Sequence, residues 1–179
     1  MLPWGDTVLI NHVTRVIQAS KINDLVVVLG YKHEKIMQAY KNPANTIFNH
    51  GWKNGKSAAI KQGLTSVAAE SEAAIFFSVD QPFISSELIN SLINCAEETK
   101  STIVATRTNG ITTVPMLFTR ALFPQFAILE GEEGGRKLLN NPQNTVEILD
   151  WKDERILIDI DSETDYKSAL AADTWKNSN

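Results

Sequence analysis

The amino-acid sequence predicts a three-layer, Rossmann-like α/β protein in which a mostly parallel sheet lies between two layers of helices. Length and composition fit one globular domain over residues 1–179, because 43% of the residues are hydrophobic and 21% are charged. Strand-like runs alternate with helix-like segments, which is typical of α/β folds. The strongest strand, residues 25–29, is apolar at every position and is therefore expected to be buried on both faces.

The N-terminal part is expected to hold three helices and two strands. Apolar residues at helical spacing predict a helix over residues 9–17, capped by Asp6 or Thr7. The β-branched run at 25–29 ends at Gly30 and an Asn-Asp turn precedes it. The other elements follow from their apolar patterns: a short helix at 33–39, a brief strand at 46–48 and a helix at 57–67.

The C-terminal part begins with a clear apolar strand at residues 73–79, which Pro82 stops because proline cannot continue a sheet ladder. Ser85 is expected to cap the next helix. Residues 162–165 fit a capping box at the start of a final helix. Further strands are expected at residues 102–105, 116–118, 146–149 and 156–158.

The charge balance argues against several function classes. Lysine and arginine number 17 against 21 aspartates and glutamates, so the formal net charge is −4. A broad nucleic-acid surface is therefore not expected, although local basic patches are compatible with this charge.

The cysteine content and the apolar runs bear on the compartment. The only cysteine, Cys95, can form no internal disulfide, which fits a reducing compartment. Apolar runs are far shorter than the roughly 18 residues of a membrane span, and residues 1–6 lack a secretory pattern. We expect a cytoplasmic protein that binds neither nucleic acid nor a membrane.

Three aspartates stand where a ligand is expected. In parallel sheets, ligands bind beyond the carboxyl ends of the strands, and Asp80 follows one predicted strand while Asp159 or Asp161 follows another. Two carboxylates at neighbouring strand ends suit one Mg²⁺, whose remaining positions are filled by water and phosphate. A turn or capping role suits aspartate at such positions equally well, so the residues alone leave both readings open.

One segment has the ending of a phosphate-binding P-loop. Residues 51–57 close with Gly-Lys-Ser ahead of a helix, but only three residues separate Gly51 from Gly55, where a P-loop has four. Bulky Trp52 also stands where the backbone would curl around phosphate. A plain loop and helix start with solvated lysines fits this segment better.

Six short motifs follow one another in register: LPWGDTVL at residues 2–9, VVVLGY at 26–31, NxxWxxGxS at 49–57, VDQPF at 79–83, GEEGGR at 131–136 and DIDSETDY at 159–166. In this order they resemble the molybdenum-cofactor nucleotidyltransferases, or MobA-like NTP transferases. The likeness is to the cytidylyltransferase branch of that family.

This resemblance implies the Rossmann-like fold of nucleotide-diphospho-sugar transferases, which is glycosyltransferase-A-like. The implied reaction transfers CMP or GMP from CTP or GTP to the phosphate of molybdopterin and releases pyrophosphate. The implied cofactor is Mg²⁺, held by Asp80 and Asp161, which would be the catalytic residues. Few other catalytic side chains are needed, because the acceptor phosphate itself attacks the α-phosphorus.

The resemblance also implies two sets of binding residues. The set that faces the nucleotide is Gly55, Lys56, Ser57, Asp80 and Gln81. The set that faces the pterin is Gly131, Glu132, Gly134 and Arg136. An ordinary helix start and a solvent loop are the plainer alternatives, since Glu132 would repel an anion.

The likeness lacks one part of the family pattern. Relatives begin with a strand and a phosphate loop, LAAGxSxRMGxxK, upstream of the segment that matches residues 2–5, whereas this chain starts after that loop. We therefore expect strand 25–29 to lack a neighbour, unless a second copy fills the gap and makes a homo-oligomer. Lys53, Lys56 and Lys61 could partly replace the missing positive charge. The alternatives that stay open are a non-catalytic homologue or binding module, and a transferase acting on a sugar phosphate or another small acceptor.

Overall fold

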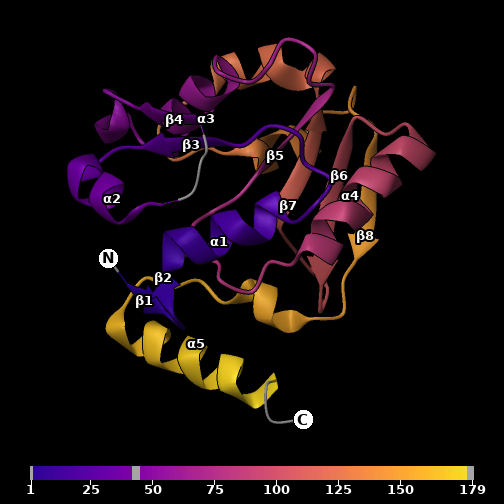
Figure 1. Cartoon of the computed structure of the whole chain (residues 1–179). Helices are drawn as coiled ribbons and strands as arrows, with labels where there is room; N and C mark the ends of the chain where they lie inside the picture. The colour runs from indigo at the N-terminus through magenta and orange to yellow at the C-terminus, as the bar shows by residue number, and fades with distance from the viewer. Residues whose placement is uncertain (1, 42–44, 177–179) are drawn as a thin grey trace.

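The computed structural model describes residues 2–41 and 45–176. It contains helices on both sides of its strands, as the three-layer prediction requires (Figure 1). The elements of the N-terminal part are β1 (Pro3–Trp4), β2 (Thr7–Val8), α1 (Leu9–Gln18), β3 (Val26–Leu29), α2 (His33–Ala39), β4 (Asn45–Phe48), the 3₁₀ helix η1 (Trp52–Asn54) and α3 (Lys56–Leu64).

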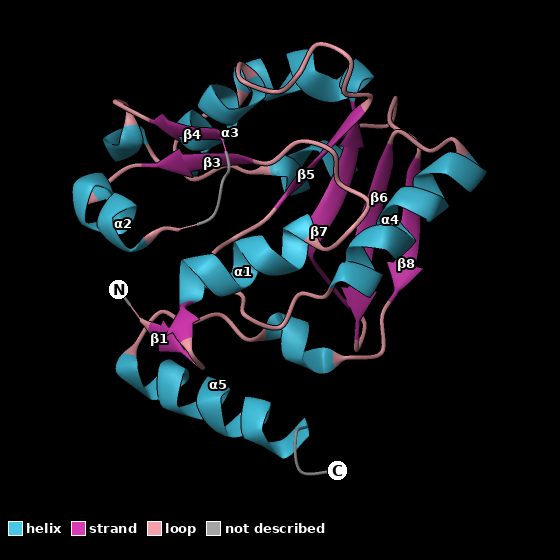
Figure 2. Ribbon diagram, viewed as in Figure 1, coloured by secondary structure: helices cyan, strands magenta, loops and turns pink. Residues whose placement is uncertain are grey.

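The C-terminal part contributes the larger sheet and the helices that cover it (Figure 2). Its elements are β5 (Ala73–Phe76), α4 (Ser86–Thr99), β6 (Ile103–Thr108), β7 (Ile111–Thr119), the 3₁₀ helices η2 (Arg120–Ile128) and η3 (Gly135–Asn140), β8 (Val146–Asp150), the 3₁₀ helix η4 (Glu154–Leu157) and α5 (Glu163–Lys176).

The larger sheet has the strand order β5-β7-β6-β8 and is mixed. Strand β7 is antiparallel to both of its neighbours, whereas β6 and β8 are parallel. The reversal comes from the two-residue turn between β6 and β7, where Asn109 and Gly110 have φ values of 48° and 75°. Asn-Gly is the preferred pair for such hairpin turns, and a hairpin makes its two strands antiparallel. The sheet therefore contains more antiparallel pairs than the apolar runs alone suggested.

Both faces of this sheet are buried, which confirms the three-layer arrangement. On one face, Leu88 and Leu92 of α4 pack with Val104 of β6. On the other face, Phe118 of β7 packs edge-to-face on Phe126 of η2, with ring centroids 5.2 Å apart. Alternate residues of each strand therefore serve opposite cores, as expected for a pleated sheet covered on two sides.

Strands β3 and β4 form a second, two-stranded parallel sheet. Within residues 2–41 and 45–176, no strand pairs with the other edge of β3 or with the outer edge of β5. Helix α3 contacts both sheets, because Gly63 lies against Val28 of β3 and Leu64 packs against the core cluster that includes Phe118 of β7. The apolar residues 26–28 are only half-buried, as expected for a strand that lacks a neighbour.

Two local predictions were wrong. The run at 156–158 forms the end of the 3₁₀ helix η4 and its C-cap, Ile158, rather than a strand, because the Asp153 side chain accepts a hydrogen bond from the Arg155 backbone and starts a helical turn. The N-cap of α1 is Val8 rather than Asp6 or Thr7, because Thr7 pairs with Trp4 in the β1–β2 hairpin.

The other caps follow the sequence. Ser85 accepts a hydrogen bond from the Leu88 backbone, and Ser162 and Asp165 exchange backbone and side-chain hydrogen bonds in the expected capping box. None of the helices in the described part of the chain is long and apolar enough to cross a membrane.

Amides on the unpaired edges of β3 and β5 are expected to exchange with solvent faster than amides of β6, which is paired on both sides. Because hydrogen-bonding groups of a strand point alternately to its two edges, about half of the amides in each strand should exchange on the order of 100-fold faster. Amide-resolved hydrogen exchange by NMR measures this difference, with β6 as the internal control. Uniformly slow exchange across β3 and β5 would contradict the unpaired edges.

Candidate functional site

A backbone hydrogen bond assembles the acidic part of the candidate site. The Ile160 amide donates to the Asp80 carbonyl at 3.0 Å, which ties the segment after β5 to the segment before α5. Ile160 is 7% exposed and packs in the core beside α1 and α4. Since neighbouring residues of an extended chain point to opposite sides, Asp159 and Asp161 both face away from that core.

The pKa of Asp159 shows which groups surround it. Burial of the carboxyl raises this pKa, and the negative charges of Asp80 and Asp161 raise it further, whereas a hydrogen bond from Gln81 and the positive charge of Lys56 lower it. Asp159 is exposed as a residue although its carboxyl group is partly shielded by these neighbours. The structure therefore brings together Asp80, Asp161, Gln81 and Lys56, four of the residues singled out from the sequence.

Two oxygen atoms in this cluster have no hydrogen-bond partner. Asp80 Oδ1 and Gln81 Oε1 are both buried without a partner in the described part of the chain. Buried acceptors are normally satisfied, so two orphaned oxygens beside several carboxylates fit a cation with oxygen ligands, such as Mg²⁺ or Mn²⁺. No group of three or more His, Cys, Asp or Glu side chains in the described ranges is arranged to hold a metal. Mg²⁺ at phosphate-transfer sites typically takes only one or two protein carboxylates.

The two predicted binding loops touch each other. The backbone amide of Ser57, at the start of α3, donates to the Gly131 carbonyl at 3.0 Å. Gly55 has φ 87° and ψ −172°, a conformation that is essentially restricted to glycine. A Cβ atom at Gly55 would lie 2.4 Å from the Gly131 oxygen, so only glycine permits this approach. The nucleotide set and the pterin set predicted from the sequence are thus parts of one surface.

Lys56 connects this surface to the carboxylates. Its Cδ atom lies 3.5 Å from the position of a Cβ atom on Gly134, so its stem crosses the loop at residues 131–136. Its charge is close enough to lower the pKa of Asp159. The ammonium group can therefore contact an anion that lies between the loops and the aspartates.

Several residues of the predicted pterin loop also make structural contacts. Arg136 donates a hydrogen bond to the Thr112 carbonyl at 2.6 Å and is thereby directed to β7. Gly135 lies against the Phe118 ring, where a Cβ atom would approach to 2.4 Å. Glu133 pairs with Lys137 at 2.5 Å, and the hydrogen bond from that lysine lowers the pKa of Glu133.

One contact at the base of the site was not anticipated from the sequence. His12 Nε2 lies 2.9 Å from the Pro82 carbonyl and fixes the segment that follows Asp80 and Gln81. The sequence feature that could have indicated this contact is the helical pattern of residues 9–17, in which His12 lies among the apolar residues.

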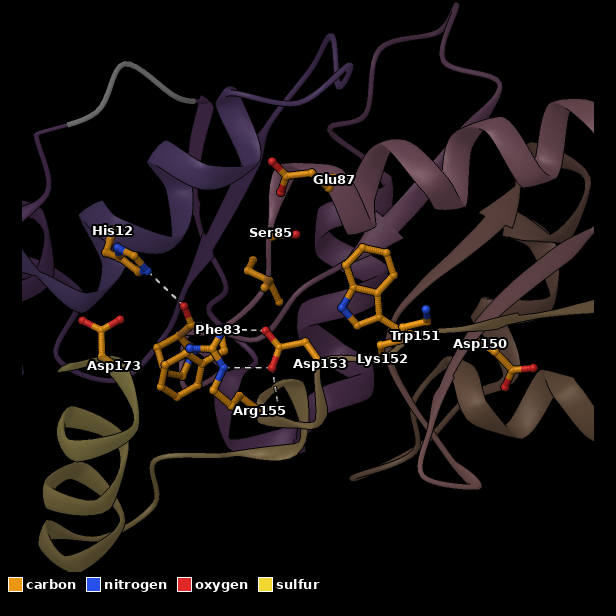
Figure 3. A pocket seen from close by; sticks show the side chains of 12 residues that line it. His12, Phe83, Ser85, Glu87, Asp150, Trp151, Lys152, Asp153, Arg155 and Asp173 are labelled. Atoms are coloured by element: carbon orange, nitrogen blue, oxygen red, sulfur yellow. Dashed lines mark hydrogen bonds and ion pairs between the residues drawn. The ribbon is translucent and has the colours of Figure 1, made fainter. Parts of the chain in front are cut away.

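A cavity of about 640 Å³ lies beside Pro82 (Figure 3). Its polar groups are partly paired, since Arg155 binds Asp153 at 2.5 Å and its guanidinium lies 5.0 Å from the Phe83 ring centre. The cavity is lined by His12, Pro82, Phe83, Ile84, Ser85, Glu87, Asp150, Trp151, Lys152, Asp153, Arg155 and Asp173. The aspartates at 80, 159 and 161 are not among these residues, so the cavity adjoins the candidate site at His12 and Pro82 but does not include the acidic cluster.

Known proteins resemble this chain in sequence and in fold. A family model described as the MobA-like NTP transferase domain matches residues 1–147. The purine catabolism protein PucB of Bacillus subtilis (strain 168) is 30% identical over 118 residues, covering 64% of this chain and 55% of PucB, so the chain spans about half the length of this curated relative.

Solved structures share the fold. The manganese complex of Rv0371c from Mycobacterium tuberculosis H37Rv superposes with a TM-score of 0.84 at 19% identity, covering 96% of this chain and 90% of the other. The molybdopterin-guanine dinucleotide biosynthesis protein A from Archaeoglobus fulgidus gives a TM-score of 0.66 at 17% identity, covering 93% of this chain and 85% of the other.

The Gly55→Ala variant is expected to lose stability. Its Cβ atom would impose both an unfavourable backbone conformation and a clash with the Gly131 oxygen, so we expect a loss of about 3 kcal/mol or more in the free energy of unfolding. Gly110→Ala is the matched control, because Gly110 also has positive φ but has open space around it; a loss of about 1 kcal/mol is expected there. Urea unfolding measures both values. Equal losses in the two variants would show that the loop contact contributes nothing.

Proposed function

The chain belongs to the MobA-like NTP transferase family, and we propose that it is a nucleotidyltransferase that moves a nucleoside monophosphate from a nucleoside triphosphate to a phosphate group of a small acceptor. The observation that carries this proposal is the orphaned Asp80 oxygen, which lies in a cluster with Asp161 and with the ammonium group of Lys56 nearby. Transfer of a phosphoryl-type group requires carboxylates that hold a divalent cation, and it is assisted by a lysine that binds a phosphate oxygen.

The residues present fit a divalent cation. Asp80 and Asp161 would hold it, with Mg²⁺ as the proposed ion. A structure with the same fold, that of Rv0371c, is a complex with manganese, which supports a divalent metal. Bound there, the ion would neutralise charge on the nucleotide phosphates. Lys56 would bind a phosphate oxygen from the side of the α3 loop. An oxygen of the acceptor phosphate then forms a bond to the α-phosphorus while the bond from that phosphorus to pyrophosphate breaks.

The proposed nucleotide is CTP or GTP, and the proposed acceptor is molybdopterin. Support comes from the six motifs of the chain and from the A. fulgidus protein, whose name places it in molybdopterin-guanine dinucleotide biosynthesis. The lone Cys95 supports a reducing compartment, and we propose the cytoplasm. Residues 1–179 are proposed to act as a single domain.

A second candidate is a non-catalytic binding module of the same family. The unpaired edges of β3 and β5 favour it, because a sheet that is interrupted beside the nucleotide loop holds that loop less rigidly. Release of pyrophosphate by this chain in the presence of an acceptor would rule this candidate out.

Loss of either proposed metal ligand is expected to weaken metal binding. We expect Mn²⁺ to bind Asp80→Asn and Asp161→Asn at least about tenfold more weakly, because each variant replaces a charged oxygen ligand by a neutral amide. Isothermal titration calorimetry with Mn²⁺ and then with Mg²⁺ and CTP or GTP provides the measurement. Glu97→Gln is the control, since Glu97 is exposed on α4 and also loses one negative charge. Unchanged affinity in both aspartate variants would refute the assignment of the metal site.

Removal of the Lys56 charge is expected to weaken triphosphate binding by about five- to tenfold, as befits one charge-assisted contact. The matched control is Lys53→Ala, because the Lys53 ammonium lies 5.5 Å from the Trp52 ring centre rather than beside the aspartates. Calorimetric titration of GTP into Lys56→Ala and Lys53→Ala compares the two. Equal effects would mean that the lysines act only through net charge.

A further inference from the structure

The carboxylate of Glu132 lies on the nucleotide loop. Its Oε1 atom is 2.7 Å from the position that a Cβ atom on Gly55 would occupy, so the carboxylate lies against the side of that glycine on which a side chain would project. The hydrogen bond from the Ser57 amide to the Gly131 carbonyl holds the two loops in this relation. Glu132 was predicted to face the pterin, but its side chain lies against the residues predicted to read the base.

This carboxylate has no partner of its own. In residues 2–41 and 45–176, the Glu132 side chain makes no hydrogen bond or ion pair, and the N-terminus of α3 receives no side-chain cap. The adjacent Glu133 differs, because Lys137 and the Glu130 amide both bind it. Glu132 therefore presents an acceptor that is free to bind a ligand.

The negative charge of Glu132 limits which part of a nucleotide can bind beside it. A carboxylate repels phosphate, so the triphosphate cannot lie at Glu132. The phosphates are better placed at the aspartates, where Asp80 Oδ1 is buried without a partner and suits a cation that binds phosphate, with the Lys56 side chain extending along Gly134. The nucleotide would then run from the aspartates to Gly55, with its base at Glu132.

We propose that Glu132 accepts a hydrogen bond from the exocyclic amino group of the nucleotide base and so determines base specificity. This inference rests on the proposed function. An ionised carboxylate only accepts hydrogen bonds, so it suits the N4 amino group of cytosine or the N1–H and N2 amino groups of guanine. Uracil and hypoxanthine lack the respective amino group. Glu132 is thus assigned to the donor nucleotide rather than to the acceptor.

Pairs of nucleotides that differ in the amino group test this assignment. Calorimetric titrations with Mg²⁺ compare GTP with ITP and CTP with UTP, on the unmodified chain and on Glu132→Ala and Glu132→Gln. We expect the unmodified chain to prefer the amino-bearing member of at least one pair by about tenfold or more. In Glu132→Ala this preference should fall to within about twofold, while the affinity for ITP or UTP stays unchanged, because only the pairing with the amino group is lost.

Glu130→Gln is the matched control. It removes one negative charge from the same loop, and the Glu130 side chain is exposed and is not among the atoms nearest to a Cβ position on Gly55. The control should keep the full preference. A preference that persists in Glu132→Ala, or its absence from the unmodified chain, would overturn the role of Glu132 while leaving the nucleotide site in place. Failure of every nucleotide to bind the unmodified chain would instead refute the proposed function, and the inference with it.

Discussion

The hydrogen bond between the Ile160 amide and the Asp80 carbonyl is the contact on which the acidic site depends. It joins two segments that are 80 residues apart, and it is protected because Ile160 is buried with the residues of α1 and α4. Since the bond uses only backbone atoms, it leaves the side chains of Asp80 and Asp161 available for a ligand. The position of the carboxylates thus follows from core packing rather than from contacts between the acids themselves.

The contact between Ser57 and Gly131 plays the corresponding part at the other end of the candidate site. It brings the start of α3 against the loop that precedes η3, and Lys56 extends from this junction to the aspartates. Two backbone hydrogen bonds therefore define the two ends of one surface. One end is acidic and has buried oxygen atoms without hydrogen-bond donors, and the other end is formed by Gly55 and the carboxylate of Glu132. A molecule with phosphates at one end and a polar ring at the other matches this distribution of groups.

The sequence alone was sufficient where short-range physics decides the structure. Strand β3, helix α2, the Ser85 cap and the capping box at Ser162 all follow from local propensity and side-chain hydrogen bonding. Three apolar residues at 156–158 suit a buried 3₁₀ turn as well as a strand, so periodicity could not separate them. Arg136 and Glu132 belong to one motif, but tertiary contacts direct one to Thr112 and the other to Gly55, which no spacing rule predicts.

Among the described residues, β3 and β5 each have one unpaired edge, and these edges affect how the protein behaves in solution as well as how the site is held. Unpaired strand edges present N–H and C=O groups that another extended chain can bind. The half-buried valines of β3 add apolar surface at one of these edges. The fold places no proline or lysine within β3 to discourage such pairing. Colloidal stability of the purified chain should therefore decline as its concentration rises, because these edges can pair between copies of the chain.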